Sequence, residues 1–381
     1  FLHAHPGTRD AQESRGLGDV YKRQGQNSYL IDAHVNLESQ TLIVSQTLIF
    51  KNPSNKELRK IYLSDWANSY EGTESQLVKH LANQFNRSFY LSSKNKLGFT
   101  NIKQLSIDNE QYEWSRMTGQ LDLIEVVLEK PLKTGNKLKL NLNYEIKIPD
   151  EKFTGYGINS NNRIFFRDFF ISLNPYINNK WLLQSNLGLR DNSNINSNYL
   201  INWTYPENYN LVSNLYQIKT LKSSKNGYKL TQWKGDSVSS PEFIFDNENK
   251  FQKISFEDNF KIVTDIIPNK NSEVELKESL RQIYNFTNSL LSPLEHKKVL
   301  ILKKDYSKNP LVGITEALSF LNPFSDSFIY ETKFIKAYLA TYLHELLNID
   351  KRKNHWIPGG IQTYVMMKYC LLYTSPSPRD S

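Results

Sequence analysis

Residues 138–148 alternate strictly between apolar and polar side chains, and this period of two restricts the possible fold more than any other feature. The apolar positions carry Leu, Tyr and Ile, and the intervening positions carry Lys, Asn and Glu. Such alternation is typical of an antiparallel strand with one face in a core and the other in water. A second alternating run at 29–37 and shorter apolar runs at 41–50 and 124–128 predict further strands. A turn is predicted at 133–136, where the sequence is Lys-Thr-Gly-Asn.

Aromatic residues crowd the segment 153–233. The set includes Phe165, Phe166, Phe169, Phe170, Trp181, Trp203 and Trp233. A sheet core is the main interpretation of this set, because aromatic side chains fit a half-buried pleated surface. A ligand-binding platform is the alternative. One helix is predicted to interrupt the strands at 74–86, where the apolar residues keep helical spacing after Ser75.

The pattern changes after Pro241. Strands are predicted at 260–264 and 298–302, and helices at 271–291 and 330–347, with a third helix beginning near Gly360. Asn271 or Ser272 would cap the first of these helices, and Pro293 would end it. The predicted fold class is therefore α+β and multidomain. An antiparallel β-rich domain at 25–248 is followed by an α/β domain at 249–369.

The two ends of the chain have a different interpretation. One DNA stretch that encodes residues 14–24 also encodes, on its complementary strand and in a shifted frame, residues 371–379. We interpret 1–24 and 370–381 as translated sequencing-adaptor DNA and predict that both form detached coils. The remaining segment is then a fragment that is open at both ends, so a signal peptide cannot be judged.

Composition excludes several classes of protein. The formal net charge is +8, but the lysines are scattered among Asn, Ser and Glu, so no nucleic-acid footprint is predicted. The single cysteine, Cys370, leaves no disulfide framework and no cysteine metal site. No apolar run reaches the roughly 18 residues that a transmembrane helix needs.

The opening Y-L-I-D-A-H-V-N-L-E, the run Q-T-L-I-F-K-N-P, the run P-L-K-T-G-N-K-L-K-L and the stretch W-I-P-G-G-I-Q-T-Y carry a family resemblance. Together they resemble the gluzincin, or membrane-alanine-aminopeptidase-like, zinc metallopeptidases, and most closely a divergent type found in Bacteroidetes. The resemblance implies a β-rich amino-terminal domain followed by a thermolysin-like catalytic domain, which is truncated here. In this family zinc is the cofactor.

The resemblance also implies where the zinc ligands should lie. Two histidines in H-E-x-x-H hold zinc from one helix face, the intervening Glu is the general base, and a second helix supplies a third ligand, a Glu. Matching W-I-P-G-G to the family's W-x-x-E-G puts Gly359 at the third ligand. The family spacing then puts Lys336 and Ala340 at the two histidines and Ala337 at the base. The zinc motif is therefore degenerate, no metal ligand or catalytic residue is assigned, and no cofactor is expected in this fragment.

Two further segments partly match motifs of this family. His344-Glu345 begins like the zinc motif, but Asn348 stands where the second histidine should be, so a solvated helix face is the main interpretation. The run at 313–317 half-matches the family's G-x-M-E-N strand, which makes Gly313 and Glu316 the candidate substrate-binding residues. His355 is predicted to lie on the surface.

The function predicted from these features is a non-catalytic role in an exported, aminopeptidase-like protein, as a peptide-binding protein or a scaffold. Its partners would be peptides or cell-envelope proteins, and it would be periplasmic, cell-surface or secreted. An active zinc aminopeptidase, with ligands misplaced here or lying beyond the fragment, is one alternative. A β-sandwich adhesion or carbohydrate-binding module that uses the aromatic residues at 165–203 is the other.

Overall fold

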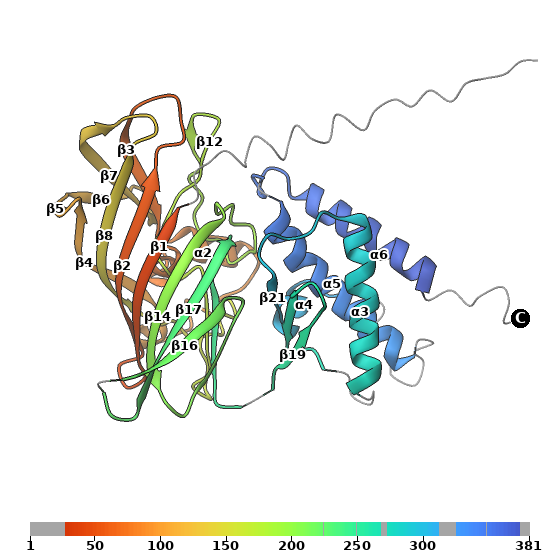
Figure 1. Ribbon diagram of the computed structural model, residues 1–381. Helices are drawn as coiled ribbons and strands as arrows, with labels where there is room; N and C mark the ends of the chain where they lie inside the picture. Colours follow the sequence, from red (N-terminus) through yellow and green to blue (C-terminus); the bar gives the residue numbers. More distant parts are fainter. Residues whose placement is uncertain are drawn as a thin grey trace, which may run out of the picture.

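The computed structural model describes residues 27–223, 225–248, 250–267, 273–311, 325–347 and 349–373. Its β-rich part and its mainly helical part lie side by side, as Figure 1 shows. The change from one to the other falls between strand β18, which ends at Asp246, and strand β19, which begins at Gln252. The predicted α+β, multidomain fold class is confirmed.

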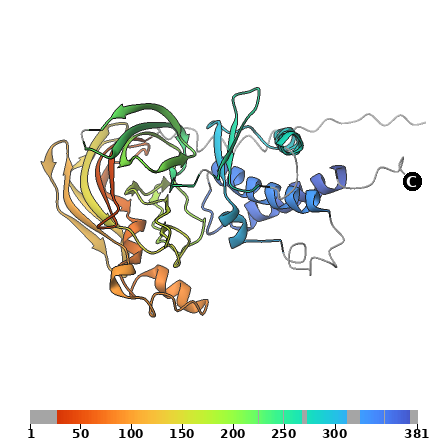
Figure 2. The ribbon, with the colours of Figure 1, turned by 90° about the horizontal axis from the view of Figure 1, so that it is seen from below.

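The largest sheet has the strand order β16-β17-β14-β1-β2-β8-β4-β5. The bounds of its strands, in chain order, are β1 Ser28–Asn36, β2 Thr41–Lys51, β4 Phe99–Ile107, β5 Glu110–Gln111, β8 Lys137–Lys147, β14 Ser197–Pro206, β16 Tyr216–Lys222 and β17 Tyr228–Val238. The alternating run at 138–148 forms β8, which pairs antiparallel with β2 and β4 and buries every second side chain. Figure 2 shows that this sheet curves around the interior of the β-rich part.

Two four-stranded sheets and a two-stranded ribbon complete the β-rich part. Their orders are β11-β3-β7-β6, β15-β18-β10-β9 and β12-β13. Their bounds are β3 Leu58–Ser64, β6 Trp114–Met117, β7 Gln120–Leu132, β9 Gly157–Ile158, β10 Ile164–Arg167, β11 Ser172–Leu173, β12 Tyr176–Ile177, β13 Lys180–Trp181, β15 Asn210–Ser213 and β18 Glu242–Asp246. The predicted turn joins β7 to β8, with Gly135 at a φ of 74°.

One strand pair departs from the antiparallel prediction. Strand β1 pairs parallel with β14 over Ser28–His34 and Asn198–Thr204. These strands are far apart in the sequence, so no turn between them fixes their direction. Alternation marks which face of a strand is buried, and it does not reveal the strand's neighbour.

The aromatic residues of 153–233 fill the core between the sheets, as the main interpretation held. Trp203 is fully buried. The centroid of its ring lies 5.0 Å from the ring centroids of Phe243 and Phe245 and 5.8 Å from that of Phe166. Most of the aromatic residues at 165–203 are buried in the same way, so they offer no open platform to a ligand.

The predicted helix at 74–86 is confirmed as α2, Gln76–Asn83, with the 3-10 turns η1 (Trp66–Tyr70) and η2 (Lys94–Lys96) on either side. The side chain of Ser75 caps α2 by accepting a hydrogen bond from the amide of Val78. Phe89 anchors the segment after α2 because its ring stacks 4.0 Å from that of Phe153. Residues 76–97 therefore form a packed unit, here called the projecting lobe, which stands out from the β-rich part (Figure 2).

The carboxy-terminal part combines a three-stranded sheet with helices. Its elements are β19 Gln252–Ser255, β20 Lys261–Thr264, α3 Glu273–Leu290, β21 Lys298–Ile301, α4 Lys303–Lys308, α5 Asp326–Leu346 and α6 Trp356–Tyr373. Strand β20 pairs parallel with β21 and antiparallel with β19. Val263, Leu300 and Leu302 pack into the core of the β-rich part, so one face of this small sheet joins the two parts.

Helix α6 corrects one prediction about the chain ends. It continues through Tyr373, so residues 370–373 are helical and not a detached coil. The other residues at 1–24 and 374–381 lie outside the described part of the chain.

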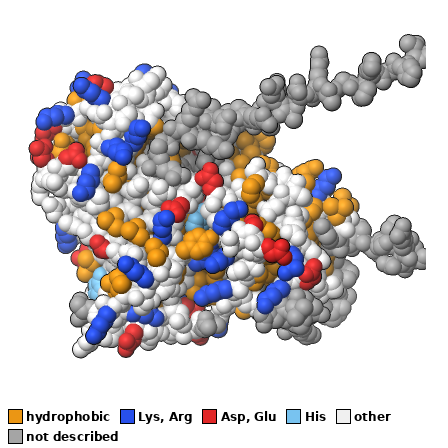
Figure 3. Space-filling view, viewed as in Figure 1, with side chains coloured by type: hydrophobic (Ala, Val, Ile, Leu, Met, Phe, Trp, Pro, Cys, Tyr) orange, Lys and Arg blue, Asp and Glu red, His pale blue; other side chains and the backbone are white. Residues whose placement is uncertain are grey.

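Within the described part of the chain, none of the helices combines the length and apolar character that crossing a membrane would require. Figure 3 shows basic and acidic side chains mixed over one face, as scattered lysines predict.

Candidate functional site

The helix pair α5 and α6 holds every position matched to the zinc site. Helix α5 begins one turn before the predicted residue 330, because the side chain of Ser325 accepts a hydrogen bond from the amide of Phe328 and caps it. The side-chain amide of Gln362 on α6 donates to the carbonyl oxygen of Lys336 on α5 at 2.7 Å. This bond brings the turn of α5 that carries Lys336 against the first turns of α6.

The matched positions themselves offer no zinc ligand. The ammonium of Lys336 turns toward the end of α4 and donates to the carbonyl oxygen of Pro310 at 3.1 Å. Ala337 is buried and Ala340 is half-buried, and neither carries a polar side-chain atom. Gly359 is exposed, with open space where a side chain would stand.

These residues do not fit a zinc ion. A zinc site needs about three or four converging nitrogen, sulfur or carboxylate ligands, whereas these four positions supply one cation and no ligand atom. Among the residues that the structure describes, no group of three or more His, Cys, Asp and Glu side chains could hold a metal ion.

The His344-Glu345 pair does not form the predicted solvated face. His344 is buried, burial holds its pKa well below the ordinary value, and its carbonyl oxygen accepts from the ammonium of Lys351 at 2.8 Å. Both carboxylate oxygens of Glu345 accept from Ser239, from its hydroxyl at 2.7 Å and from its amide at 3.2 Å. The prediction was wrong because the end of α5 packs against the loop after β17, a neighbour that the helical pattern does not reveal.

The remaining predicted residues divide into two groups. Gly313 and Glu316 lie outside the described residues, so their substrate-binding role stays a prediction. His355 is exposed, as predicted.

A buried charge network, not predicted from the sequence, lies where the two parts of the chain meet. Arg167 on β10 donates to both carboxylate oxygens of Asp305 on α4, at 2.9 and 3.0 Å. The same guanidinium donates to Glu242 on β18 at 2.8 Å and to the hydroxyl of Tyr156 at 2.5 Å. The side chains of Arg167 and Glu242 are each 4% exposed and that of Asp305 is 6% exposed, so water screens these pairs little.

Arg190 completes this network, here called the interdomain ion cluster and made of Arg167, Arg190, Glu242 and Asp305. Its guanidinium lies 3.3 Å from Glu242 and 3.4 Å from Asp305, and it also donates to the hydroxyl of Thr341 on α5 at 2.9 Å. Two guanidiniums therefore face two carboxylates, and the cluster is formally neutral. Hydrogen bonds satisfy both carboxylates, as a stable buried ion pair requires.

The space beside Arg167 is small. A cavity of about 10 Å³ lies among Trp66, Tyr70, Tyr156, Arg167 and Asp168, with room for about one water molecule. The four charged side chains are bonded to one another across the two parts, so the cluster forms a structural joint.

No local motif could have indicated this cluster. Its pairs join residues 138 and 75 positions apart in the chain, from strands and a helix whose association the sequence does not state. The only available signal was a charged residue at the end of an apolar run, as at Arg167 in I-F-F-R, where burial is normally costly.

Within the interdomain ion cluster, Asp305 predicts a loss of stability in acid. Burial alone would raise the pKa of Asp305, but the guanidiniums of Arg167 and Arg190 outweigh it and hold that pKa below the ordinary range. In the unfolded chain the carboxyl of Asp305 has a pKa of about 3.9, so it binds a proton at a higher pH than in the folded protein. Acid therefore favours the unfolded chain. The stability contributed by Asp305 is fully present above about pH 5 and declines below about pH 4.

Urea unfolding of the wild type and Asp305→Asn at pH 6, 4 and 3 measures this effect. The difference between their free energies of unfolding is expected to narrow as the pH falls. The matched control is Asp236→Asn, because this aspartate lies on the surface beside Lys234 and should show no such narrowing. A wild-type advantage that stays constant from pH 6 to 3 would contradict the assignment.

A scan against protein-family models finds no match, and a search of curated proteins finds none. Solved structures do match. The M1 zinc metallopeptidase from Deinococcus radiodurans is 12% identical, with a TM-score of 0.54 over 92% of this chain and 72% of that one. The chain has the fold of the M1 zinc metallopeptidases.

Two structures of mutant M1 zinc metallopeptidases match equally well. One is bound to a Tyr-Ser-Ala substrate, with 13% identity and a TM-score of 0.55 over 92% of this chain and 72% of that one. The other is a two-domain enzyme bound to L-tryptophan, with 12% identity and a TM-score of 0.55 over 93% and 73% of the chains. At this identity the likeness establishes the fold, and function depends on the residues at the site.

Proposed function

We propose that this chain is a non-catalytic protein built on the M1 zinc metallopeptidase fold, which acts as a peptide-binding scaffold. One observation carries the proposal. In the alignment that the family resemblance implies, Lys336, Ala337, Ala340 and Gly359 match two histidines and two glutamates, and they lie on the helix pair α5 and α6.

The interdomain ion cluster supports the scaffold part of this proposal. The cluster joins β10 and β18 to α4 and α5 through bonds that leave no free carboxylate for proton transfer. Glu345, near the carboxy-terminal end of α5, accepts two hydrogen bonds from Ser239. A peptide ligand is proposed because a similar fold was solved with the Tyr-Ser-Ala substrate bound.

Metal content and peptidase activity test the proposal together. The protein is dialysed against zinc and washed, and its metal content is measured by elemental analysis. Hydrolysis of alanyl-, leucyl- and arginyl-aminomethylcoumarin is measured in parallel. The expected result is substoichiometric zinc and no hydrolysis above the rate of a heat-denatured sample.

Stoichiometric zinc that is lost in His344→Ala, accompanied by hydrolysis, would overturn the proposal and restore the active-enzyme alternative. His355→Ala is the matched control, because this histidine is exposed on the surface. Peptide binding is measured separately with fluorescent Tyr-Ser-Ala by anisotropy. Absence of saturable binding would remove the peptide part of the proposal.

A further inference from the structure

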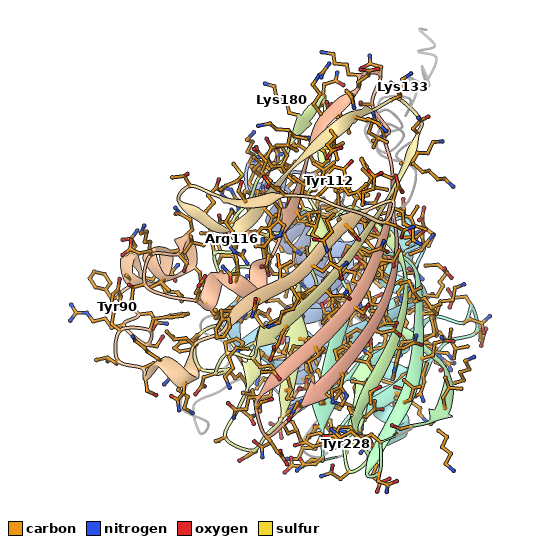
Figure 4. All side chains as sticks on the ribbon, turned by 90° about the vertical axis from the view of Figure 1, so that its left-hand side faces the viewer. Tyr90, Tyr112, Arg116, Lys133, Lys180 and Tyr228 are labelled. Atoms are coloured by element: carbon orange, nitrogen blue, oxygen red, sulfur yellow. The ribbon has the colours of Figure 1, made fainter. Side chains whose placement is uncertain are left out.

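The projecting lobe exposes large apolar side chains to an unusual degree. Phe85 is 90% exposed, Leu91 is 83% exposed and Tyr90 is 54% exposed, all within one short stretch of chain. Figure 4 shows Tyr90 at the outer end of the lobe, away from the sheets. A single exposed apolar residue needs no explanation, but several grouped on a projection are typical of a binding surface.

Phe85 is also unfavourable where it stands. The amide of Phe85 bonds to the carbonyl oxygen of Ala82 and the amide of Asn86 to that of Leu81, which is the Schellman ending of a helix. Phe85 occupies the left-handed position of this ending, with a φ of 61°, where glycine or asparagine is normally found. A bulky residue costs stability there, and its exposed ring recovers none of it by packing. The fold therefore gives no reason for a phenylalanine at this position.

The projecting lobe also carries several basic side chains. Lys79 pairs with Glu74 at 3.4 Å and Lys96 with Asp150 at 3.0 Å. Arg87 and Lys94 are exposed and have no ion pair within the part of the chain that the structure describes. Exposed apolar side chains suit the boundary between the headgroups and acyl chains of a membrane. Basic side chains without an ion pair suit the phosphates of its anionic lipids.

The lobe is firm enough to carry such a contact. Phe89, between the exposed residues, is buried against Phe153 and Tyr70, and the hydroxyl of Ser92 donates to the carbonyl oxygen of Ser88 at 2.6 Å. The exposed side chains are thus presented on a fixed backbone, and little ordering is needed on binding.

We propose that the projecting lobe docks this protein onto an anionic lipid surface. Phe85, Tyr90 and Leu91 enter the boundary between headgroups and acyl chains, and Arg87 and Lys94 lie against lipid phosphates. This proposal does not depend on the zinc site or on the proposed function.

Flotation with vesicles tests the proposal on the whole chain. The protein should float with vesicles of phosphatidylcholine and phosphatidylglycerol, less at high salt, and little with phosphatidylcholine alone. Phe85→Gly/Leu91→Ser should weaken binding to the mixed vesicles at least about tenfold. Arg87→Ala/Lys94→Ala should weaken it and remove most of its salt dependence.

The single variant Phe85→Gly separates binding from folding. Glycine suits the left-handed position, so the melting temperature should stay the same or rise while vesicle binding falls. The matched control is Ile218→Ser/Leu221→Ser on strand β16, which removes two exposed apolar residues that also stand among lysines, and it should bind as the wild type does.

Three results would overturn the proposal. One is an absence of flotation with anionic vesicles. Another is an equal loss of binding in the β16 control. The third is a self-associated form in size-exclusion chromatography that Phe85→Gly converts to monomer, because the lobe would then bind a second copy of the chain.

Discussion

Replacing Arg167 by leucine should lower the free energy of unfolding by about 3–5 kcal/mol, because it leaves Glu242 and Asp305 buried without their main counter-ion. The guanidinium satisfies the carboxylates from β18 and α4 together, so no other side chain can take over its geometry. Arg190 stays beside both carboxylates but lies farther from them, at 3.3 and 3.4 Å. The loss should therefore be large but short of complete unfolding.

Urea denaturation followed by circular dichroism and by tryptophan fluorescence measures this effect. Lys103→Leu is the control, because Lys103 and its partner Glu145 are 54% and 38% exposed and lie 3.7 Å apart, a geometry that should contribute at most about 1 kcal/mol. Arg167→Lys should give an intermediate loss, since lysine keeps the charge but cannot form the two-pronged contact. A cost for Arg167→Leu no larger than that of Lys103→Leu would show that the cluster does not join the two parts.

The strands could be predicted from the sequence because a half-buried strand shows its buried face as a period of two. The predicted strand at 138–148 and β8 at Lys137–Lys147 agree to within a residue at each end. Capping chemistry likewise fixed the beginning of α2, where Ser75 bonds to Val78. Each of these features depends on neighbours a few residues away, which the sequence displays directly.

Contacts between distant elements could not be predicted. The parallel pairing of β1 with β14 and the bonds of Arg167 to Asp305 join distant segments, and nothing local identifies the partner. His344 shows the same limit. Its position on an amphipathic helix predicted exposure, but the end of α5 is covered by chain from the β-rich part.

The zinc-site alignment came from a resemblance and stays a prediction. Gln362 bonds to the carbonyl oxygen of Lys336, so the α5 turn matched to the first histidine does lie against α6. If that alignment holds, this chain differs from a zinc enzyme in the side chains at those positions, and the prediction below tests it.

Restoring three ligands should therefore restore zinc binding. In Lys336→His/Ala340→His/Gly359→Glu, two imidazoles stand four residues apart, which is about 6 Å along α5 and the spacing that zinc helices use. The new glutamate enters open space near the start of α6, where a negative charge is favoured by the helix dipole. We expect about one zinc per chain, against none for the wild type. Zinc at about 100 times its dissociation constant should stabilise the variant by about 2.7 kcal/mol.

A control of equal composition makes this prediction specific. In Lys333→His/Ala340→His/Gly359→Glu the imidazoles stand seven residues apart, about 10 Å along the helix, too far to share one ion at the ~2.1 Å of a zinc–nitrogen bond. Elemental analysis after dialysis, together with the shift in melting temperature on adding zinc, compares the two variants. Equal zinc content in both would mean that the added histidines bind zinc adventitiously. No zinc in either would mean that α5 and α6 do not bring residues 336, 340 and 359 to one point, and the alignment on which the degenerate site depends would be wrong.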